Sequence, residues 1–190
     1  PESNDITFPA AILQAPLYDV PASYEENLGG IGFIIAHEIT HAFDNNGAKY
    51  DENGNAADWW EPEDYDEFRR LCGEMIEFYD GWEGVPGIPV DGTLTLSENV
   101  ADQGALQCIT EIAAGLEDPD LKRLYTSFAH CWATVTAREY SDIRSKIDYH
   151  SDEKLRVNRT VVNCGEFYEA FGIEEGDGMY VKPEDRVRIW

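Results

Sequence analysis

The chain has 190 residues, of which 43% are hydrophobic and 12% aromatic, enough for one domain with a buried core and too much for a disordered chain. Its 14 Lys and Arg against 38 Asp and Glu give a formal net charge of −24, which argues against nucleic acid and anionic membranes as partners. No apolar run approaches the length of a membrane span, and no linker or repeat divides the chain.

The N-terminal part of the chain is predicted to be mostly irregular. Residues 4–13 are expected to be extended because Phe8 precedes a proline, which disfavours helix. A loop rich in proline and acidic residues follows. Gly29-Gly30 then open a predicted buried helix over residues 31–44, because this stretch is apolar and contains no proline.

This predicted helix contains the sequence His37-Glu38-Ile39-Thr40-His41. Residues four apart share one helix face, so His37 and His41 are expected to point two imidazoles at one place. Such a pair suits Zn²⁺, and Glu38 would be close enough to act as a general base on a zinc-activated water. The alternative is a buried helix whose two histidines bond to carbonyl groups.

Two further helices are predicted over residues 62–80 and 96–115, and the second contains Glu98 and Asp102 on one face. Either these acids form a solvated face, or they pair with cations, as acids on an apolar helix require. A hydrolytic zinc needs three protein ligands and one open position. Glu98, 57 residues after His41, is the candidate third ligand.

Other residues are candidates for supporting this site. Asp44, three residues after His41, either accepts the outer N–H of a ligand imidazole or solvates the helix end. Asp102 either does the same or holds a nearby cation. Helices are also predicted over residues 120–137, 140–147 and 164–171, with Ser151 capping a helical turn between the last two. The four cysteines are interpreted as free, mostly buried thiols of a reducing compartment.

Four blocks of this sequence together resemble the C-terminal catalytic part of the neprilysin and endothelin-converting-enzyme family of zinc endopeptidases, in particular its bacterial soluble oligoendopeptidases. They follow the family's order and span almost the whole chain: Phe8-Pro9-Ala10-Ala11-Ile12-Leu13, Gly30-Ile31-Gly32 through His37-Glu38-Ile39-Thr40-His41-Ala42-Phe43-Asp44, Ser97-Glu98-Asn99-Val100-Ala101-Asp102, and Arg188-Ile189-Trp190. The resemblance favours a zinc site over two core histidines.

The resemblance implies a mainly α-helical, thermolysin-like (gluzincin) catalytic domain with a small strand element at the N-terminus. Residues 1–190 would be the C-terminal catalytic domain of a larger two-lobed protease, with the missing N-terminal lobe as partner. The implied activity is that of a zinc metalloendopeptidase with one Zn²⁺ per chain. It would cleave short peptides on the amino side of apolar residues.

The resemblance also implies individual roles. His37, His41 and Glu98 resemble the zinc ligands, and Glu38 resembles the general base. The family's second active-site acid, its oxyanion-stabilising histidine and its substrate-binding arginine correspond to Asp102, His150 and Arg156. An apolar pocket and a site for a peptide's C-terminal carboxylate would be formed by Leu17, Phe33, Ile34, Trp132, Val157 and Arg188, although each pocket residue also suits an ordinary core.

The chain departs from the family pattern in three ways. The family's Asn-Ala-aromatic strand and most of its second lobe are absent, and Gly172 and Val187 stand where animal members carry cysteines. The missing cysteines favour a cytoplasmic bacterial member. Two alternatives to an active enzyme stay open: a non-catalytic zinc-stapled module that only binds peptides, and a fragment that is inactive on its own.

Overall fold

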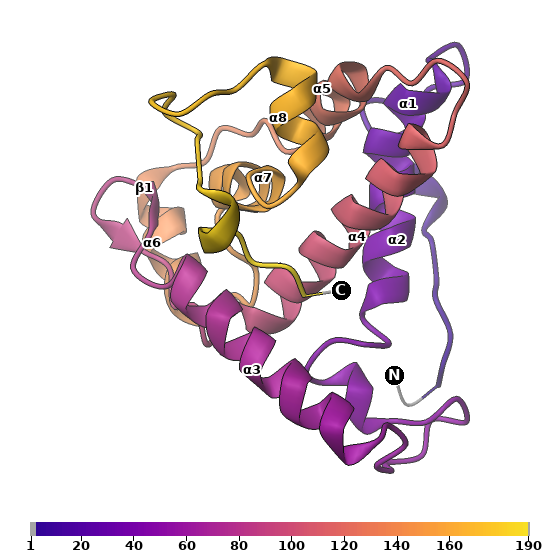
Figure 1. Cartoon of the computed structure of the whole chain (residues 1–190), viewed down its shortest axis with the longest axis vertical. Helices are drawn as coiled ribbons and strands as arrows, with labels where there is room; N and C mark the ends of the chain where they lie inside the picture. Colours follow the sequence, from indigo (N-terminus) through magenta and orange to yellow (C-terminus); the bar gives the residue numbers. More distant parts are fainter. Residues whose placement is uncertain (1–2, 190) are drawn as a thin grey trace.

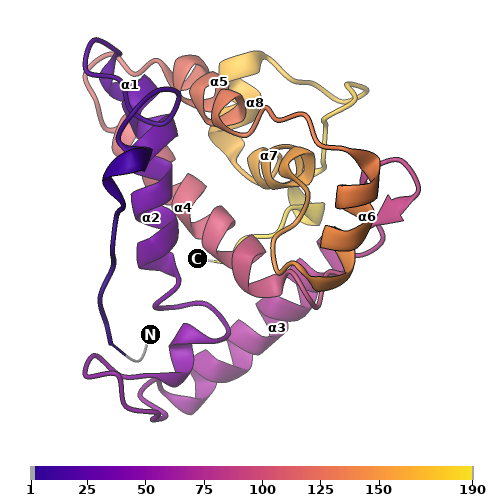
Figure 2. The ribbon, with the colours of Figure 1, turned by 180° about the vertical axis from the view of Figure 1, so that it is seen from behind.

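The fold is organised around α4 (Leu96–Ala114), a helix whose buried residues cover most of its circumference. In the computed structural model, which describes residues 3–189, α2 (Phe33–Thr40) packs beside α4 (Figure 1). The same pair lies side by side when the molecule is viewed from behind (Figure 2). The sequence elements 33–40 and 96–114 are thereby brought together, as a shared metal site requires.

The helix that carries the two histidines is longer than predicted. It begins at Tyr24 and runs without a break through α1 (Tyr24–Asn27), the π-helical segment η2 (Leu28–Gly32) and α2. Ser23 caps its start, because its hydroxyl accepts the Glu26 N–H while the Glu26 carboxylate accepts the Ser23 N–H. The predicted start near residue 31 was therefore wrong, and the helix ends at Thr40 rather than at residue 44.

Gly29 and Gly30 lie inside this helix because other chain segments approach them closely. A Cβ atom on Gly29 would lie 2.3 Å from the carbonyl oxygen of Leu124 on α5 (Leu121–Cys131). A Cβ atom on Gly30 would lie 2.2 Å from the carbonyl oxygen of Leu17, which also accepts the Ile31 N–H at 2.6 Å. Close tertiary packing therefore outweighs the low helix propensity of the two glycines.

Replacing Gly29 with alanine is expected to lower the free energy of unfolding by about 1–3 kcal/mol, because the added methyl group meets a backbone atom that no rotamer change can move. Gly73, on α3 (Pro62–Tyr79), is the matched control, since a Cβ there would meet nothing within 4 Å. Gly73→Ala should raise stability by about 0.5–1 kcal/mol. Urea unfolding measures the free energy of unfolding of both variants. Equal stabilities for Gly29→Ala and the unsubstituted chain would contradict the close approach of Leu124 to Gly29.

The remaining elements largely match the predicted helices. The predictions near residues 62, 96, 140 and 164 are confirmed within a few residues, whereas α5 ends at Cys131 instead of residue 137. The other elements are η1 (Ala10–Ile12), η3 (Gly47–Lys49), β1 (Glu83–Val85), β2 (Ile88–Pro89), α6 (Arg138–Ile147), α7 (Glu153–Val161), α8 (Gly165–Phe171) and η4 (Pro183–Asp185).

The mainly helical fold class is confirmed, but its small strand element lies elsewhere than predicted. The strands β1 and β2 form an antiparallel pair within residues 83–89, and no strand is assigned to the described residues before Glu83. Residues 5–9 have no regular secondary structure, and the chain then turns into η1. Strand geometry needs a neighbouring strand to bond to, and residues 3–189 offer none there.

Two hydrophobic clusters hold the helices together. One joins Phe33 of α2 to residues of α4, α5, α7 and α8, and the other joins α3 to the start of α4 and to Val187 and Ile189. The C-terminal block Arg188-Ile189-Trp190 is thus anchored in the core through Ile189, while Trp190 lies outside the described residues. Within residues 3–189, none of the helices has the length and apolar character that crossing a bilayer requires.

Candidate metal centre

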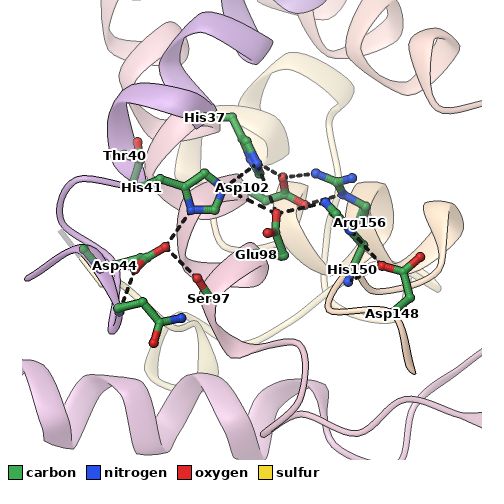
Figure 3. Close-up of polar contacts among 12 residues, drawn as sticks. His37, Thr40, His41, Asp44, Ser97, Glu98, Asp102, Asp148, His150 and Arg156 are labelled. Atoms are coloured by element: carbon green, nitrogen blue, oxygen red, sulfur yellow. Dashed lines mark hydrogen bonds and ion pairs between the residues drawn. The ribbon is translucent and has the colours of Figure 1, made fainter. Parts of the chain in front are cut away.

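Three side chains from two helices converge on one point between α2 and α4 (Figure 3). The Nε2 atoms of His37 and His41 are 3.1 Å apart, and the Glu98 Oε2 atom lies 3.2 Å from the first and 3.5 Å from the second. Within residues 3–189, they are the one group of three or more His, Cys, Asp and Glu residues whose ligand atoms all lie within 4.8 Å of one another. The structure therefore brings together the three residues predicted as zinc ligands.

The opposite side of each ring faces a carboxylate. The His41 Nδ1 atom lies 2.6 Å from Asp44 Oδ2, and the His37 Nδ1 atom lies 2.8 Å from Asp102 Oδ1. A carboxylate favours the proton on the nitrogen that faces it, so each neutral ring presents an Nε2 lone pair to the other ring and to Glu98. Three lone-pair donors that meet repel one another unless positive charge lies among them, either as a second proton on each ring or as a bound cation.

The spacing of these three atoms fits zinc. Tetrahedral Zn²⁺ with bonds of about 2.0–2.1 Å to imidazole nitrogen and carboxylate oxygen separates its ligand atoms by about 3.3 Å. The observed separations of 3.1, 3.2 and 3.5 Å bracket that value. The donor set, two imidazoles and one carboxylate, is also one that catalytic zinc sites use.

The surroundings favour positive charge at this point. Burial opposes the charged form of His41, but its contacts with Asp44 and Glu98 raise its pKa to about 10. His37 is buried too, and Asp102 and Glu98 raise its pKa above the ordinary value. Burial would raise the pKa of Glu98, yet hydrogen bonds from His150, His37 and His41 hold it far below its usual range. The carboxylate is therefore ionised and available to a cation.

Asp44 is fixed in place at the end of the histidine helix. Its Oδ1 atom accepts the backbone N–H groups of Asn46 and Gly47, both at 2.7 Å, and its Oδ2 atom accepts the Ser97 hydroxyl at 2.6 Å. Ser97 directly precedes Glu98 on α4, so Asp44 links the two helices that supply the candidate ligands. The alternative that Asp44 only solvates the helix end does not fit a side chain that is 3% exposed.

Asp102 contacts both a candidate ligand and a cation. Besides its contact with His37, it receives two hydrogen bonds from Arg156, from Nε to Oδ2 and from Nη2 to Oδ1, each 2.7 Å long. Although burial would raise the pKa of Asp102, the Arg156 guanidinium and His37 hold it below its usual value. Arg156 in turn lies over the Trp132 ring, 4.0 Å from its centre. Asp102 therefore contacts both an imidazole and a cation, the two kinds of partner considered for it from the sequence.

His150 lies at the edge of the cluster, in the loop between α6 and α7. Its Nε2 atom is 3.1 Å from Glu98 Oε2, and its Nδ1 atom is 2.8 Å from Asp148 Oδ1. The next residue, Ser151, does not cap α7 as predicted. Asp152 is the cap, whereas the buried Ser151 hydroxyl donates to Asn99 Oδ1 on α4 at 2.7 Å. This bond holds the His150 loop against the helix that carries Glu98.

The other predicted site residues are less closely joined to the cluster. Glu38 follows His37 on α2, and its side chain is exposed, with no hydrogen bond or ion pair to the other described residues. Phe33 is 1% exposed and belongs to the core, with Ile34, Trp132 and Val157 packed against it in one cluster. Leu17 is half-buried and Arg188 is exposed.

Sequence reasoning missed three residues that shape this site. Ser97 bonds to Asp44, Asn99 bonds to Ser151, and Asp148 bonds to His150. The Asp148 contact had a signal in the sequence, because a carboxylate two residues before a histidine can fold back onto its ring. The Ser97–Asp44 and Asn99–Ser151 contacts each join residues more than 50 positions apart, so no local sequence pattern predicts them.

Comparison with known proteins places these residues in a family context. The sequence profile of peptidase family M13 matches residues 1–187. A neutral endopeptidase of Lactococcus lactis subsp. cremoris is 46% identical over the whole chain, which covers 30% of that protein. Human endothelin-converting enzyme 1 is 36% identical, also over the whole chain, which covers 26% of its length.

The structural comparison agrees with the sequence comparison. The zinc metalloprotease ZMP1 of Mycobacterium tuberculosis, solved in complex with an inhibitor, superposes with a TM-score of 0.92 at 38% identity. That superposition covers 100% of this chain and 31% of ZMP1. The chain thus spans about a third or less of the length of these relatives.

Proposed function

This chain belongs to peptidase family M13, and from that premise we propose that it forms the C-terminal catalytic domain of a larger, two-lobed zinc metalloendopeptidase. The observation that carries the proposal is the convergence of His37, His41 and Glu98 at separations that suit tetrahedral zinc. The share of the relatives that the chain spans supports a further lobe, which would be its partner within the same protein.

One Zn²⁺ per chain would be held by these three residues, with a fourth position left for water or substrate. When bound, zinc polarises the scissile carbonyl and lowers the pKa of a water molecule. Asp102 and Asp44 hold the two imidazoles in the tautomer and orientation that zinc binding needs. Such outer contacts also make the rings more basic, and so better ligands.

Glu38 is proposed as the general base. It is the residue next to His37 on α2, and its carboxylate makes no hydrogen bond or ion pair with other described side chains. A base must be free to accept a proton from the attacking water and to pass it to the leaving amine. The neighbouring acids are unsuitable, because Asp44 and Asp102 are buried and already bonded to the two rings and other donors.

His150 and Arg156 are proposed to stabilise the oxyanion that develops during peptide cleavage. The His150 ring contacts Glu98 and is fixed by Asp148, and the Arg156 guanidinium is fixed by Asp102, which also contacts His37. Donors that are oriented in advance stabilise developing charge without reorganising during the reaction. The buried, ionised Asp102 suits an orienting role better than that of a proton donor, because Arg156 stabilises its charge.

Short peptides with an apolar residue after the scissile bond are the proposed substrates. The Trp132 ring contacts Arg156 and Phe33, which in turn contact Asp102 and the His37 ring. Ile34 and Val157 pack in the same cluster, and Leu17 contributes the backbone next to Gly30. The exposed Arg188 is kept as the candidate for binding a peptide's terminal carboxylate.

The rival function is a zinc-stapled module that binds peptides without cleaving them. A structural zinc is held by four protein ligands, whereas a catalytic one keeps a position open. Within residues 3–189, the metal-ligating cluster contains three residues, and the nearby His150 is outside it. The three-residue cluster therefore favours the enzyme.

We expect the complete protein to cleave a fluorescence-quenched peptide with an apolar residue after the scissile bond. A chelator should abolish cleavage, and added zinc should restore it, because the proposed mechanism depends on the metal. Residues 1–190 alone, assayed in parallel, test whether the domain is active by itself. Zinc bound at one ion per chain without cleavage of any peptide in a mixed library would favour the zinc-stapled module.

A further inference from the structure

Arg144 connects the two helices that flank the His150 loop. It lies on the last turn of α6, and its Nε atom donates to Asp148 Oδ2 at 2.9 Å. Its Nη1 atom donates to Glu153 Oε1, on the first turn of α7, at 2.5 Å. One guanidinium therefore spans the end of α6 and the start of α7. Residues 148–152 form the loop between these two helices (Figure 2).

The Asp148 carboxylate divides its two oxygen atoms between Arg144 and His150. While Oδ2 accepts from Arg144, Oδ1 accepts the His150 backbone N–H at 3.0 Å and faces its Nδ1 atom at 2.8 Å. Figure 3 shows Asp148 and His150 in this arrangement, with the far side of the ring directed toward Glu98. Because the carboxylate is a rigid plane, holding one oxygen sets the direction of the other.

His150 depends on these bonds for its orientation. Its side chain is 40% exposed, in contrast to the 6% of His37, so core packing alone does not fix the ring. The ring instead has Asp148 on its Nδ1 side and Glu98 on its Nε2 side. Loss of the Asp148 contact would let the ring turn away from Glu98.

We propose that Arg144 is a positioning residue that sets the direction of the His150 ring through Asp148. This inference rests on the proposed function, in which His150 donates to the oxyanion. Glu153 holds the Arg144 side chain in place by accepting a hydrogen bond from its Nη1 atom. Bridging two carboxylates in fixed directions needs the planar fork of arginine, which the single ammonium group of a lysine does not supply.

The first test is Arg144→Met in the complete, zinc-loaded protein. We expect kcat to fall about tenfold, with KM and zinc content little changed, as for other residues that orient an active-site group. Lys146→Met is the matched control, because Lys146 also lies on α6 and pairs with an acid four residues before it, Asp142, at 2.7 Å. That pair is exposed, and its loss should leave kcat unchanged.

A double-substitution cycle separates positioning from general support of the fold. If Arg144 acts through His150, Arg144→Met should cause no further loss of kcat in a His150→Gln background. Arg144→Lys should recover only part of the lost activity. An unchanged kcat in Arg144→Met, or the same fold loss with and without His150, would overturn the inference.

A crystal structure of the Arg144→Met protein gives an answer that does not depend on activity. We expect the His150 ring to be displaced or to occupy more than one orientation. A ring whose Nε2 atom stays within hydrogen-bond distance of Glu98 would overturn the inference. A complete protein that cleaves no peptide before any substitution would instead count against the proposed function, so the two failures are distinguishable.

Discussion

Replacing Glu38 with glutamine is expected to lower kcat by about 10²- to 10⁴-fold while zinc content stays the same. Glutamine has nearly the same size and shape as glutamate, but its amide does not accept a proton from water. Because the Glu38 side chain is exposed and not bonded to other described side chains, the substitution should not disturb the fold. Steady-state kinetics on a quenched peptide, together with metal analysis, measures both quantities.

Glu25→Gln is a suitable control for this substitution. Glu25 lies on α1, in the same continuous helix, and its replacement makes the same change of charge far along the helix from the two histidines. It should leave kcat within experimental error of the unsubstituted protein. A Glu38→Gln protein that cleaves peptide at the original rate would remove Glu38 from the role of base and reopen the search among the other acids.

The local part of the site was predictable because helix geometry is regular. Once the helix reaches Thr40 and His41 follows with helical backbone angles, the four-residue spacing places both imidazoles on one face, whatever the rest of the chain does. Asp44 and Asp102 were also predicted as partners of the rings or of a cation, and both contacts are present. The distant Glu98 was different, because no local spacing links it to His41, 57 residues earlier. It was a candidate only as an acid on a second apolar helix, and the family resemblance then supported that choice.

The parts that escaped prediction depend on contacts between distant segments. Gly29 and Gly30 suggested a helix start, since glycine disfavours helix, but the approach of Leu124 and Leu17 requires small residues there. Ser151 suggested a helix cap by its type, yet its hydroxyl donates to Asn99 on another helix. Local propensity cannot distinguish these outcomes, because the deciding partner lies far away in the sequence.

Replacing Glu98 with alanine is expected to abolish zinc binding and, with it, peptide cleavage. The substitution removes one of three protein ligands and leaves two imidazoles whose outer nitrogens still face Asp102 and Asp44. Metal analysis after dialysis should give one zinc per chain before the substitution and close to none after it. Glu111→Ala, on the exposed far end of α4, is the matched control and should retain zinc.

Thermal unfolding gives a second measurement that needs no substrate. A ligand that binds only the folded state stabilises it by about 4 kcal/mol when its free concentration is about 1,000 times its Kd. Zinc should therefore raise the unfolding temperature of the original protein and of Glu111→Ala, but not that of Glu98→Ala. If Glu98→Ala gained as much stability from zinc as the control, the metal would be held without this carboxylate. The pairing of α2 with α4 would then serve another purpose.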